Sequence, residues 1–433
     1  MKITHIHIER FRGFQNEDFE VGSLLTAIAG QNGTQKSTLL GIITQTFTLK
    51  TEDSMRVEKP LCGGSYISAF KDKFRLSPTF DKPKGHEWTI SFDAGMDDFT
   101  VESIKRTGDP NVRFWKKGAR QEGDGYISFP TIFLSLKRLV PVAEEAKIIT
   151  DDTLLTQEEL NEFKQLHNKI LIAQTPISSA TTITSKNKQS IGVSTELYDW
   201  NQNSMGQDNL GKIILALFSF KRLHDKYPRQ YKGGILAIDE MDATMYPASQ
   251  VELLKVLRKY ASKLNLQILF TTHSMSLLKA MDDLVQEVTK KEETANQAKI
   301  LYLKKVDDKI AIKQGVNFKG IQLDLNVVAE GNNRKKNRIT AYTEDKENIL
   351  FVKAILKSKA FVLDFVDVTL PCSTLMELVT KRVPAFIYPY SIVILDGDVR
   401  MNKNDLRKIN NADNSIAQLV QQAEEEKAAR EAA

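Results

Sequence analysis

The sequence predicts an α/β fold in which helices cover a parallel sheet, with an antiparallel β lobe beside it. Three apolar runs with the character of buried parallel strands, LLTAIAG, GGILAIDE and LQILFTTHS, each end in glycine or polar residues. Segments with apolar residues at helical spacing follow these runs. This alternation favours a parallel sheet with its functional site at the carboxyl ends of the strands.

The N-terminal part of the chain is expected to supply two strands, a helix and the antiparallel lobe. Residues 3–11 (ITHIHIERF) alternate apolar and polar side chains and predict a strand that ends in a turn at FRGF. The run 24–30 predicts a buried strand, and KSTLLGIITQTF (36–47) predicts the helix that follows it. Between residues 60 and 135, alternating segments separated by Gly and Pro predict antiparallel strands.

The next part is expected to contain helices and two more buried strands. Residues 142–172 are rich in Glu, Lys and Leu and predict helix, whereas the polar segment 175–190 has no core pattern and predicts a loop or linker. An amphipathic helix is expected over 208–227, because its apolar residues share one face. The predicted strands at 233–240 and 266–274 flank another helical segment, LKVLRKYASKLN.

These elements predict four segments along the chain. A first lobe, a helical insertion with a linker, a second lobe that completes the sheet and a last α/β unit are expected at residues 1–141, 142–195, 196–330 and 339–433. The basic, polar stretch GNNRKKNR (331–338) is expected to link the last two.

Composition limits the classes of protein to which the chain can belong. The 433 residues contain no run of eighteen or more apolar residues and no signal-peptide core, so we expect a cytoplasmic protein. Cys62 and Cys372 are the only cysteines, which argues against a disulfide framework or a Cys-based metal site. The formal net charge of +5 is too small to predict nucleic-acid binding by itself.

The stretch GQNGTQKST nearly matches the phosphate-binding pattern G-x-x-x-x-G-K-[ST]. In such a loop, backbone N–H groups and a helix N-terminus face the phosphates. Lys36 is expected to reach the β- and γ-phosphates, and the Ser37 hydroxyl to take a Mg²⁺ coordination position. The expected nucleotide-binding residues are Gly30, Gln31, Asn32, Gly33, Thr34, Gln35, Lys36, Ser37 and Thr38.

Gln35 departs from this pattern, because it stands where the last glycine belongs. Glycine at that position supplies freedom in φ or clearance for the ligand. A right-handed backbone at Gln35 would let its side chain point away and would preserve binding. A different conformation would weaken or alter binding, and the sequence leaves both outcomes open.

Two adjacent carboxylates follow a predicted buried strand in ILAIDEMDA. Carboxylates at such a place are costly to bury unless a cation or hydrogen bonds meet them. Asp239 is expected to hold Mg²⁺ through water, and Glu240 to orient or deprotonate an attacking water. The alternative is a strand that simply emerges into solvent.

Two more polar groups are expected at the same end of the sheet. NSMGQ (203–207) opens the amphipathic helix, where the Ser204 hydroxyl and the Gly206 backbone would form a second anion site. An ordinary N-cap turn is the alternative for this segment. His273 follows the strand LQILFTT and can donate a hydrogen bond to a γ-phosphate, although a lone histidine is usually structural.

Together, GQNGTQKST, NSMGQ, ILAIDEMDA and TTHS resemble the ABC-type ATPase heads of the SMC, Rad50 and RecF group, with NSMGQ in the place of the family signature LSGGQ. The resemblance implies ATP and Mg²⁺ as ligands, and a dimer of heads that encloses ATP between two chains. It assigns Glu240 and His273 to catalysis, Ser37 and Asp239 to the metal, Ser204, Gly206 and Gln207 to a signature that acts in trans, and Asp242 to the D-loop between subunits.

The predicted insertion at 142–195 is too short for the coiled coils of SMC or Rad50, which favours compact relatives such as OLD nucleases and antiphage ATPases. The loop AGQNGT-x-KSTLLG resembles the PtuA family of Septu defence ATPases, which also occurs as a retron effector subunit. That resemblance makes Gln35 a family trait. It implies a partner HNH nuclease, PtuB, a nucleic-acid target and, in a retron system, a reverse transcriptase with its RNA–DNA product.

The last unit resembles a TOPRIM domain. RITAYTEDKENILFVKAIL predicts strand, turn and helix, and YSIVILDGD predicts a strand that ends in Asp396 and Asp398. Glu344 matches the TOPRIM glutamate, but Asp345 replaces the glycine that usually follows it. The short remainder of the chain favours a degenerate or truncated unit that serves as a scaffold. An active metal-dependent nuclease and a plain strand end are the alternatives.

The sequence therefore predicts an ATPase subunit of an antiphage complex that pairs its heads and controls a partner nuclease. A self-contained ATPase–TOPRIM endonuclease of the OLD or Gabija type is the first alternative, and a RecF-like DNA-repair ATPase is the second. Replacement of Asp396 or Asp398 by Ala would abolish DNA cleavage by the isolated chain only if the chain itself is the nuclease.

Overall fold

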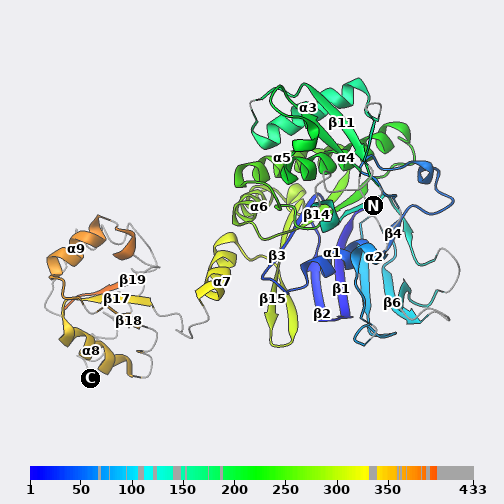
Figure 1. Cartoon of the computed structure of the whole chain (residues 1–433). Coiled ribbons are helices and arrows are strands. Elements are labelled where there is room, and N and C mark those ends of the chain that lie inside the picture. The colour runs from blue at the N-terminus through cyan, green and yellow to red at the C-terminus, as the bar shows by residue number, and fades with distance from the viewer. Residues whose placement is uncertain are drawn as a thin grey trace. The chain divides into compact units, whose positions relative to one another are not determined.

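The computed structural model divides into two compact units, Met1–Leu325 and Asn326–Ala433 (Figure 1). The division falls within α7 (Phe318–Glu330). The structure describes residues 1–66, 70–77, 79–93, 95–105, 112–119, 124–139, 148–151, 154–173, 175–185, 189–330, 339–357, 360, 363–366, 368–381, 383–386 and 391–396. The predicted linker 331–338 and Asp398 lie outside these ranges.

A mixed six-stranded sheet forms the centre of the larger unit and confirms the predicted α/β fold (Figure 1). Its spatial order is β16 (Lys309–Lys313), β15 (Ala298–Val306), β3 (Leu25–Gly30), β14 (Leu266–Thr272), β13 (Gly234–Ile238) and β9 (Thr131–Leu134). All neighbours pair in parallel except β16, which is antiparallel to β15. The carboxyl ends of β3, β13 and β14 therefore meet at one edge.

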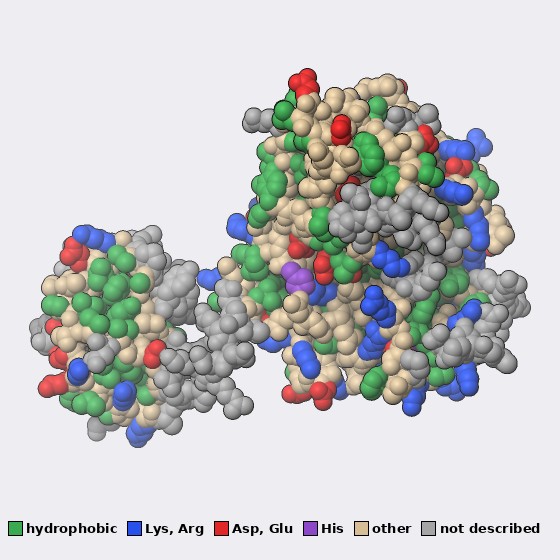
Figure 2. All heavy atoms as spheres, viewed as in Figure 1, with side chains coloured by type: hydrophobic (Ala, Val, Ile, Leu, Met, Phe, Trp, Pro, Cys, Tyr) green, Lys and Arg blue, Asp and Glu red, His purple; other side chains and the backbone are tan. Residues whose placement is uncertain are grey.

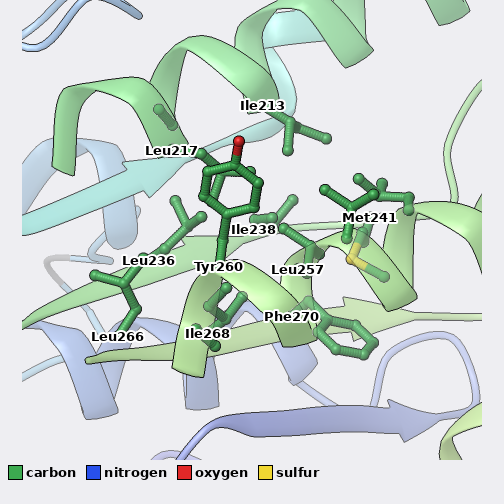
Figure 3. Close-up of a cluster of buried hydrophobic side chains, with 14 of the residues drawn as sticks. Ile213, Leu217, Leu236, Ile238, Met241, Leu257, Tyr260, Leu266, Ile268 and Phe270 are labelled. Carbon is green, nitrogen blue, oxygen red and sulfur yellow. The ribbon is translucent and has the colours of Figure 1, made fainter. Parts of the chain in front are cut away.

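Helices cover both faces of this sheet. On one face lie α4 (Met205–Lys226), α5 (Pro247–Lys263) and α6 (Met275–Val288), and on the other lies α1 (Lys36–Thr44). Side chains of β13 alternate between the two cores, because Leu236 and Ile238 face α4 and α5 while Ile235 and Ala237 join the core around α1. Figure 3 shows Ile213 and Leu217 of α4 and Tyr260 of α5 gathered with these strand residues.

The predicted antiparallel lobe is a five-stranded sheet that shares a core with α1. Its order is β2 (Phe14–Glu20), β1 (Ile3–Phe11), β5 (Glu87–Phe92), β6 (Phe99–Lys105) and β7 (Val112–Lys116), and α2 (Phe70–Lys73) lies beside it. The antiparallel prediction for 60–135 is wrong at its end, because β9 pairs in parallel with β13 and β8 (Ile127–Ser128) in parallel with β4 (Phe47–Thr48). The helix predicted over 36–47 ends at Thr44.

The loop predicted at 175–190 is wrong, because this segment forms strands. β11 (Ser179–Thr184) and β12 (Gln189–Ser194) pair antiparallel, and β10 (Ile149–Asp151) adds a third strand inside the segment that was predicted helical. Of that segment, α3 (Gln157–Leu171) is helical. Burial of Ile191 and Val193 in the core with α4 outweighs the polar composition of the segment.

The smaller unit contains a three-stranded parallel sheet in the order β18 (Leu363–Phe365), β17 (Ile339–Thr343) and β19 (Ser391–Ile394). Its described α-helices include α8 (Lys346–Leu356) and α9 (Cys372–Thr380), so the predicted strand, turn and helix at its start are present.

Figure 2 shows Lys and Arg side chains scattered over the visible face of the larger unit. Within the described ranges, no helix is long and apolar enough to cross a bilayer.

Candidate functional site

The loop between β3 and α1 makes a tight turn that contains left-handed residues. Gly33 is exposed at φ 80°, in the left-handed region that favours glycine. The Thr34 hydroxyl donates to the Gln31 carbonyl over 2.8 Å and closes the turn. The loop then enters α1, so the N–H groups of the first helical turn face the same space.

Gln35 adopts a left-handed conformation, φ 61° and ψ 33°, immediately before α1. The right-handed backbone considered above is therefore absent, and a residue with a Cβ pays about 1–2 kcal/mol for this geometry. The side chain nevertheless lies against the turn at Gly13, because a Cβ built on Gly13 would stand 2.9 Å from Gln35 Nε2. Gln35 thus has the left-handed backbone that glycine adopts readily, with its side chain beside the turn between β1 and β2.

Lys36 lies across the loop and is 8% exposed. Its Nζ donates to the carbonyl oxygens of Gly30 and Gln31 over 3.1 and 3.0 Å. Burial lowers the pKa of Lys36 to about 8, and Glu240, Asp239 and Asp242 oppose this decrease. Phosphate oxygens can replace these carbonyl partners, since the ammonium already points into the loop.

Ser37, Asp239 and Thr271 connect α1, β13 and β14 at the carboxyl edge of the sheet. Asp239 Oδ1 accepts hydrogen bonds from Ser37 Oγ at 2.9 Å and from Thr271 Oγ1 at 2.7 Å. The carboxylate is 5% exposed, so these bonds compensate for its burial. Ser37 and Asp239 are hard oxygen donors of the kind that Mg²⁺ accepts alongside water and phosphate oxygens, and the pair fits that ion. No cluster of three or more His, Cys, Asp or Glu in the described ranges forms a metal site.

Glu240 is half-buried and also has a left-handed backbone, at φ 49°. Its N–H donates to Thr271 Oγ1 over 2.6 Å. Burial raises the pKa of the Glu240 carboxyl, as do Asp239 and Asp242, whereas Lys36 and Arg138 oppose the increase. A raised pKa moves the carboxylate toward the range of a general base.

His273 and Asp242 lie at the same edge of the sheet. The backbone N–H of His273 donates to Asp242 Oδ1 over 3.3 Å. Burial lowers the pKa of the His273 imidazole, and Lys36 acts in the same direction, against Asp242 and Asp239. A lowered pKa favours a neutral ring with one N–H available to an anionic oxygen.

Ser204 is the N-cap of α4 and forms a capping box with Gln207. The Gln207 side chain also donates to the Tyr198 hydroxyl over 2.8 Å. Gly206 is buried, and a Cβ there would stand 2.5 Å from the Thr244 carbonyl oxygen. These residues therefore contact the segment after Glu240 and the β12–α4 connection. Their predicted role with a second chain's nucleotide stays a prediction.

Sequence reasoning missed three polar side chains of this site. Thr271 bonds both to Asp239 and to the Glu240 backbone, and a hydroxyl at the end of a buried strand was the available signal. Arg138 donates to the Glu240 carbonyl oxygen, and Asn209 joins Arg138 to α4. An arginine just after the strand TIFL was visible in the sequence, but its burial and direction depend on tertiary packing.

The smaller unit brings its two described acidic candidates to one sheet edge. Glu344 follows β17 and Asp396 follows β19, and these strands pair in parallel at Thr343 and Ile394. Asp345 caps α8, since its Oδ1 accepts from the N–H of Asn348 over 2.9 Å. The cap explains an aspartate there without a metal, and the TOPRIM assignment stays a prediction.

Residues 141–278 match the family model described as an AAA ATPase domain. This segment contains α4, Asp239, Glu240 and His273, and it covers less than half of the chain. The segment is thus similar to an ATPase domain. A comparison with curated proteins gives no match.

Solved structures with similar folds include the SMC head domain from Thermotoga maritima, at 14% identity and a TM-score of 0.40 over 73% of this chain and 100% of that one. The Smc head domain bound to the C-terminal domain of ScpA, from Pyrococcus furiosus, has 12% identity and a TM-score of 0.42 over 76% and 99%. The recombination mediator protein RecF with ATPrS has 11% identity and a TM-score of 0.37 over 72% and 98%. Because these TM-scores lie below 0.5, function is inferred from the site itself.

Proposed function

We propose that the chain binds Mg·ATP in the loop between β3 and α1 and hydrolyses it. The observation that supports this most is the contact of Ser37 from α1 with Asp239 from β13, at 2.9 Å, beside Lys36 in the phosphate loop. The first turn of α1 and the residue after β13, about 200 residues apart in sequence, thereby present a cation, a hydroxyl and a carboxylate at one sheet edge. The match of residues 141–278 to an ATPase domain supports the same activity.

Each residue has a distinct task in this proposal. Lys36 binds the β- and γ-phosphate oxygens, and Mg²⁺, held by Ser37 and through water by Asp239, would neutralise charge on these oxygens. Glu240 orients the attacking water and accepts its proton. His273 donates a hydrogen bond to the γ-phosphate and marks whether that phosphate is present.

We propose further that two chains pair across the nucleotide, with Ser204, Gly206 and Gln207 of one chain completing the site of the other. Asp242 would lie between the paired chains. Large apolar side chains are exposed in the first turn of α4, in the segment before it and just before α5, where Met205, Leu197 and Tyr246 are 42%, 81% and 48% exposed. Covering such side chains would stabilise a pair, which supports an interface at this surface.

The finer proposal is an ATPase of a Septu-like, retron-compatible antiphage complex that controls an HNH nuclease of the PtuB type and a nucleic-acid target. The support is the loop resemblance with its Gln35. The proposal predicts that a gene for an HNH nuclease lies beside the gene of this chain. Coexpression of the two proteins tests it, and we expect ATP-dependent DNA cleavage by the complex and not by either protein alone. Cleavage by the isolated chain that Asp396→Ala abolishes would favour the nuclease alternative instead.

Steady-state hydrolysis by the purified chain tests the ATPase proposal. We expect phosphate release to depend on Mg²⁺ and to fall to background in Lys36→Ala. Lys279→Ala is the matched control, because Lys279 is an exposed lysine of α6 paired with Asp283. Equal hydrolysis by wild type and Lys36→Ala would contradict the proposal.

A further inference from the structure

Arg138 is a buried arginine directly beside the acidic edge of the sheet. β9 pairs in parallel with β13, and the Asp239 N–H donates to the Leu134 carbonyl over 3.0 Å. A single turn of 3₁₀ helix, Leu136–Leu139, then carries Arg138 back toward the sheet. The residue is 2% exposed, so its guanidinium has exchanged water for protein partners.

Among the described residues, the acceptors bonded to this guanidinium are all neutral. Nε donates to Asn209 Oδ1 at 2.7 Å, Nη1 to the carbonyls of Leu134 and Ser135 at 3.3 and 3.1 Å, and Nη2 to the Glu240 carbonyl at 2.8 Å. A buried cation without a bonded carboxylate costs several kcal/mol unless nearby charge compensates it.

Carboxylates of the candidate site supply that compensation. Burial lowers the pKa of Arg138 to about 10, and Asp239, Glu240 and Asp242 oppose the decrease. The pKa of Glu240 responds in turn to Asp239, Asp242, Lys36 and Arg138. The same three carboxylates also act on the pKa of Lys36. The charge of Arg138 therefore acts on the carboxylates of the site, although its hydrogen bonds go to neutral oxygens, among them the backbone carbonyl of Glu240.

One hydrogen bond of Arg138 and one of Thr271 hold the backbone of Glu240. Arg138 binds its carbonyl, and Thr271 accepts from its N–H over 2.6 Å. The residue is at φ 49°, a conformation that costs about 1–2 kcal/mol for a side chain with a Cβ and persists only where its surroundings impose it. The Ala243 N–H donates to the same carbonyl over 3.1 Å, so Arg138, Thr271 and Ala243 are the described residues bonded to this backbone.

Asn209 anchors Arg138 to the helix whose N-terminus carries Ser204 and Gly206. Its Oδ1 accepts from Arg138, and its Nδ2 donates to the Ala243 carbonyl over 3.0 Å. The side chain is fully buried, at 0% exposure. Hydrogen bonds thus connect α4 without interruption to Glu240 and to the segment that follows it.

We propose that Arg138 is a positioning residue that sets the direction of the Glu240 carboxylate for hydrolysis, and that Asn209 ties this direction to α4. The inference rests on the proposed ATPase function. Arg138 touches neither phosphate nor water in this account, because it acts through the Glu240 backbone. A movement of α4, for instance on contact with a second chain, would be transmitted to Glu240 through the hydrogen bonds of Asn209 and Arg138.

The test compares Arg138→Gln with wild type in two measurements, binding of a fluorescent ATP analogue and kcat for Mg·ATP. A misplaced Glu240 predicts an unchanged dissociation constant and a kcat lower by on the order of 100-fold. Arg138→Lys keeps the charge but not the forked donors, so its kcat is expected to lie between those of wild type and Arg138→Gln. Arg222→Gln is the control, because Arg222 pairs with Glu159 over 2.6 Å on the insertion, away from the sheet edge.

A double-mutant cycle separates positioning from a general structural role. If Arg138 acts through Glu240, Arg138→Gln has no further effect on kcat in a Glu240→Gln background. Additive losses, or a matching loss of nucleotide binding, would overturn the proposal. Asn209→Leu removes the hydrogen bonds to Arg138 and to the Ala243 carbonyl. It must show the same pattern of kcat, and it replaces Arg138→Gln as the test if that variant does not fold. No hydrolysis by wild type would instead contradict the ATPase function itself.

Discussion

Two parallel strands of this chain are followed by carboxylates, and their surroundings differ. β13 is buried along its whole length, and Asp239 after it is 5% exposed and bonded to Ser37 and Thr271. β19 is mostly half-buried, and Asp396 after it is exposed. Similar sequence patterns, an apolar run followed by acidic residues, thus lead to different sites.

The difference shows that a strand-end carboxylate becomes part of a preorganised site only where other elements supply partners. At β13, α1 and β14 contribute hydroxyl donors, and a buried arginine contributes charge. In the smaller unit, the aspartate after β17 caps α8, and the cap is a sufficient reason for it. The following predictions test whether hydrolysis depends only on the residues at the end of β13 and not on those at the ends of β17 and β19.

The largest effect is expected for Glu240→Gln. Loss of the general base should lower kcat by about 100-fold or more while ATP binding persists, because the amide keeps the size but cannot accept the proton. Asp396→Asn, the same kind of change at the exposed edge, should leave hydrolysis unchanged. Phosphate release measured for both variants tests this contrast. Equal losses of kcat would mean that carboxylates of both sheets are needed for hydrolysis.

Asp239→Asn should weaken the binding of Mg²⁺ at the site. The amide oxygen can still accept from Ser37 and Thr271, so the fold is retained, but the negative charge that attracts Mg²⁺ is gone. The Mg²⁺ concentration for half-maximal hydrolysis should rise by about 10- to 100-fold. A Mg²⁺ titration at fixed ATP measures this, and EDTA should abolish hydrolysis by wild type. An unchanged Mg²⁺ requirement would remove Asp239 from the metal site.

Gly206→Ala should destabilise the larger unit, because the new Cβ would stand 2.5 Å from the backbone oxygen of Thr244. We expect the free energy of unfolding to fall by about 1–3 kcal/mol, as for other overpacked sites. Gly320→Ala in α7 is the control, since its Cβ would meet only side-chain atoms, those of Val316 at 3.1 Å and Asn317 at 3.3 Å, and no backbone atom. Urea denaturation compares them, and equal stabilities would show that α4 tolerates the shift.

The smallest effect is expected for Gln35→Gly. Glycine relieves the left-handed strain at φ 61° but gains freedom in the unfolded chain, so the free energy of unfolding should rise by ~1 kcal/mol or less. ATP affinity should be retained, because the backbone conformation does not change. Gln35→Ala keeps the strain and loses the contact at Gly13, so it should destabilise. A clear loss of stability in Gln35→Gly would show that the glutamine side chain contributes more than its strain costs.

Much of this fold was predictable from local pattern, and the failures have identifiable causes. Buried strands such as 24–30 and 266–274 were predictable because apolar runs that end in polar residues have few other solutions. The pairing of β11 with β12 was missed, because Ser and Thr make up half of the residues of the two strands and burial of β12 against α4 selects strands.

For the site, the sequence placed Lys36, Ser37, Asp239 and Glu240 at element ends that the topology then brought together. It could not place Arg138 or Asn209, since their roles depend on which buried polar groups face each other across distant segments. The conformation of Gln35 was equally out of reach, because the side chain packs against the turn at Gly13, which is distant in sequence.

The most direct test of the account is an equilibrium titration of the purified chain with Mg·ATP, beside Lys36→Ala. The account predicts saturable binding by wild type and its loss in the variant, because Lys36 supplies the cation of the phosphate loop. Absence of binding by wild type at any Mg²⁺ concentration would contradict it, and so would equal binding by the two proteins.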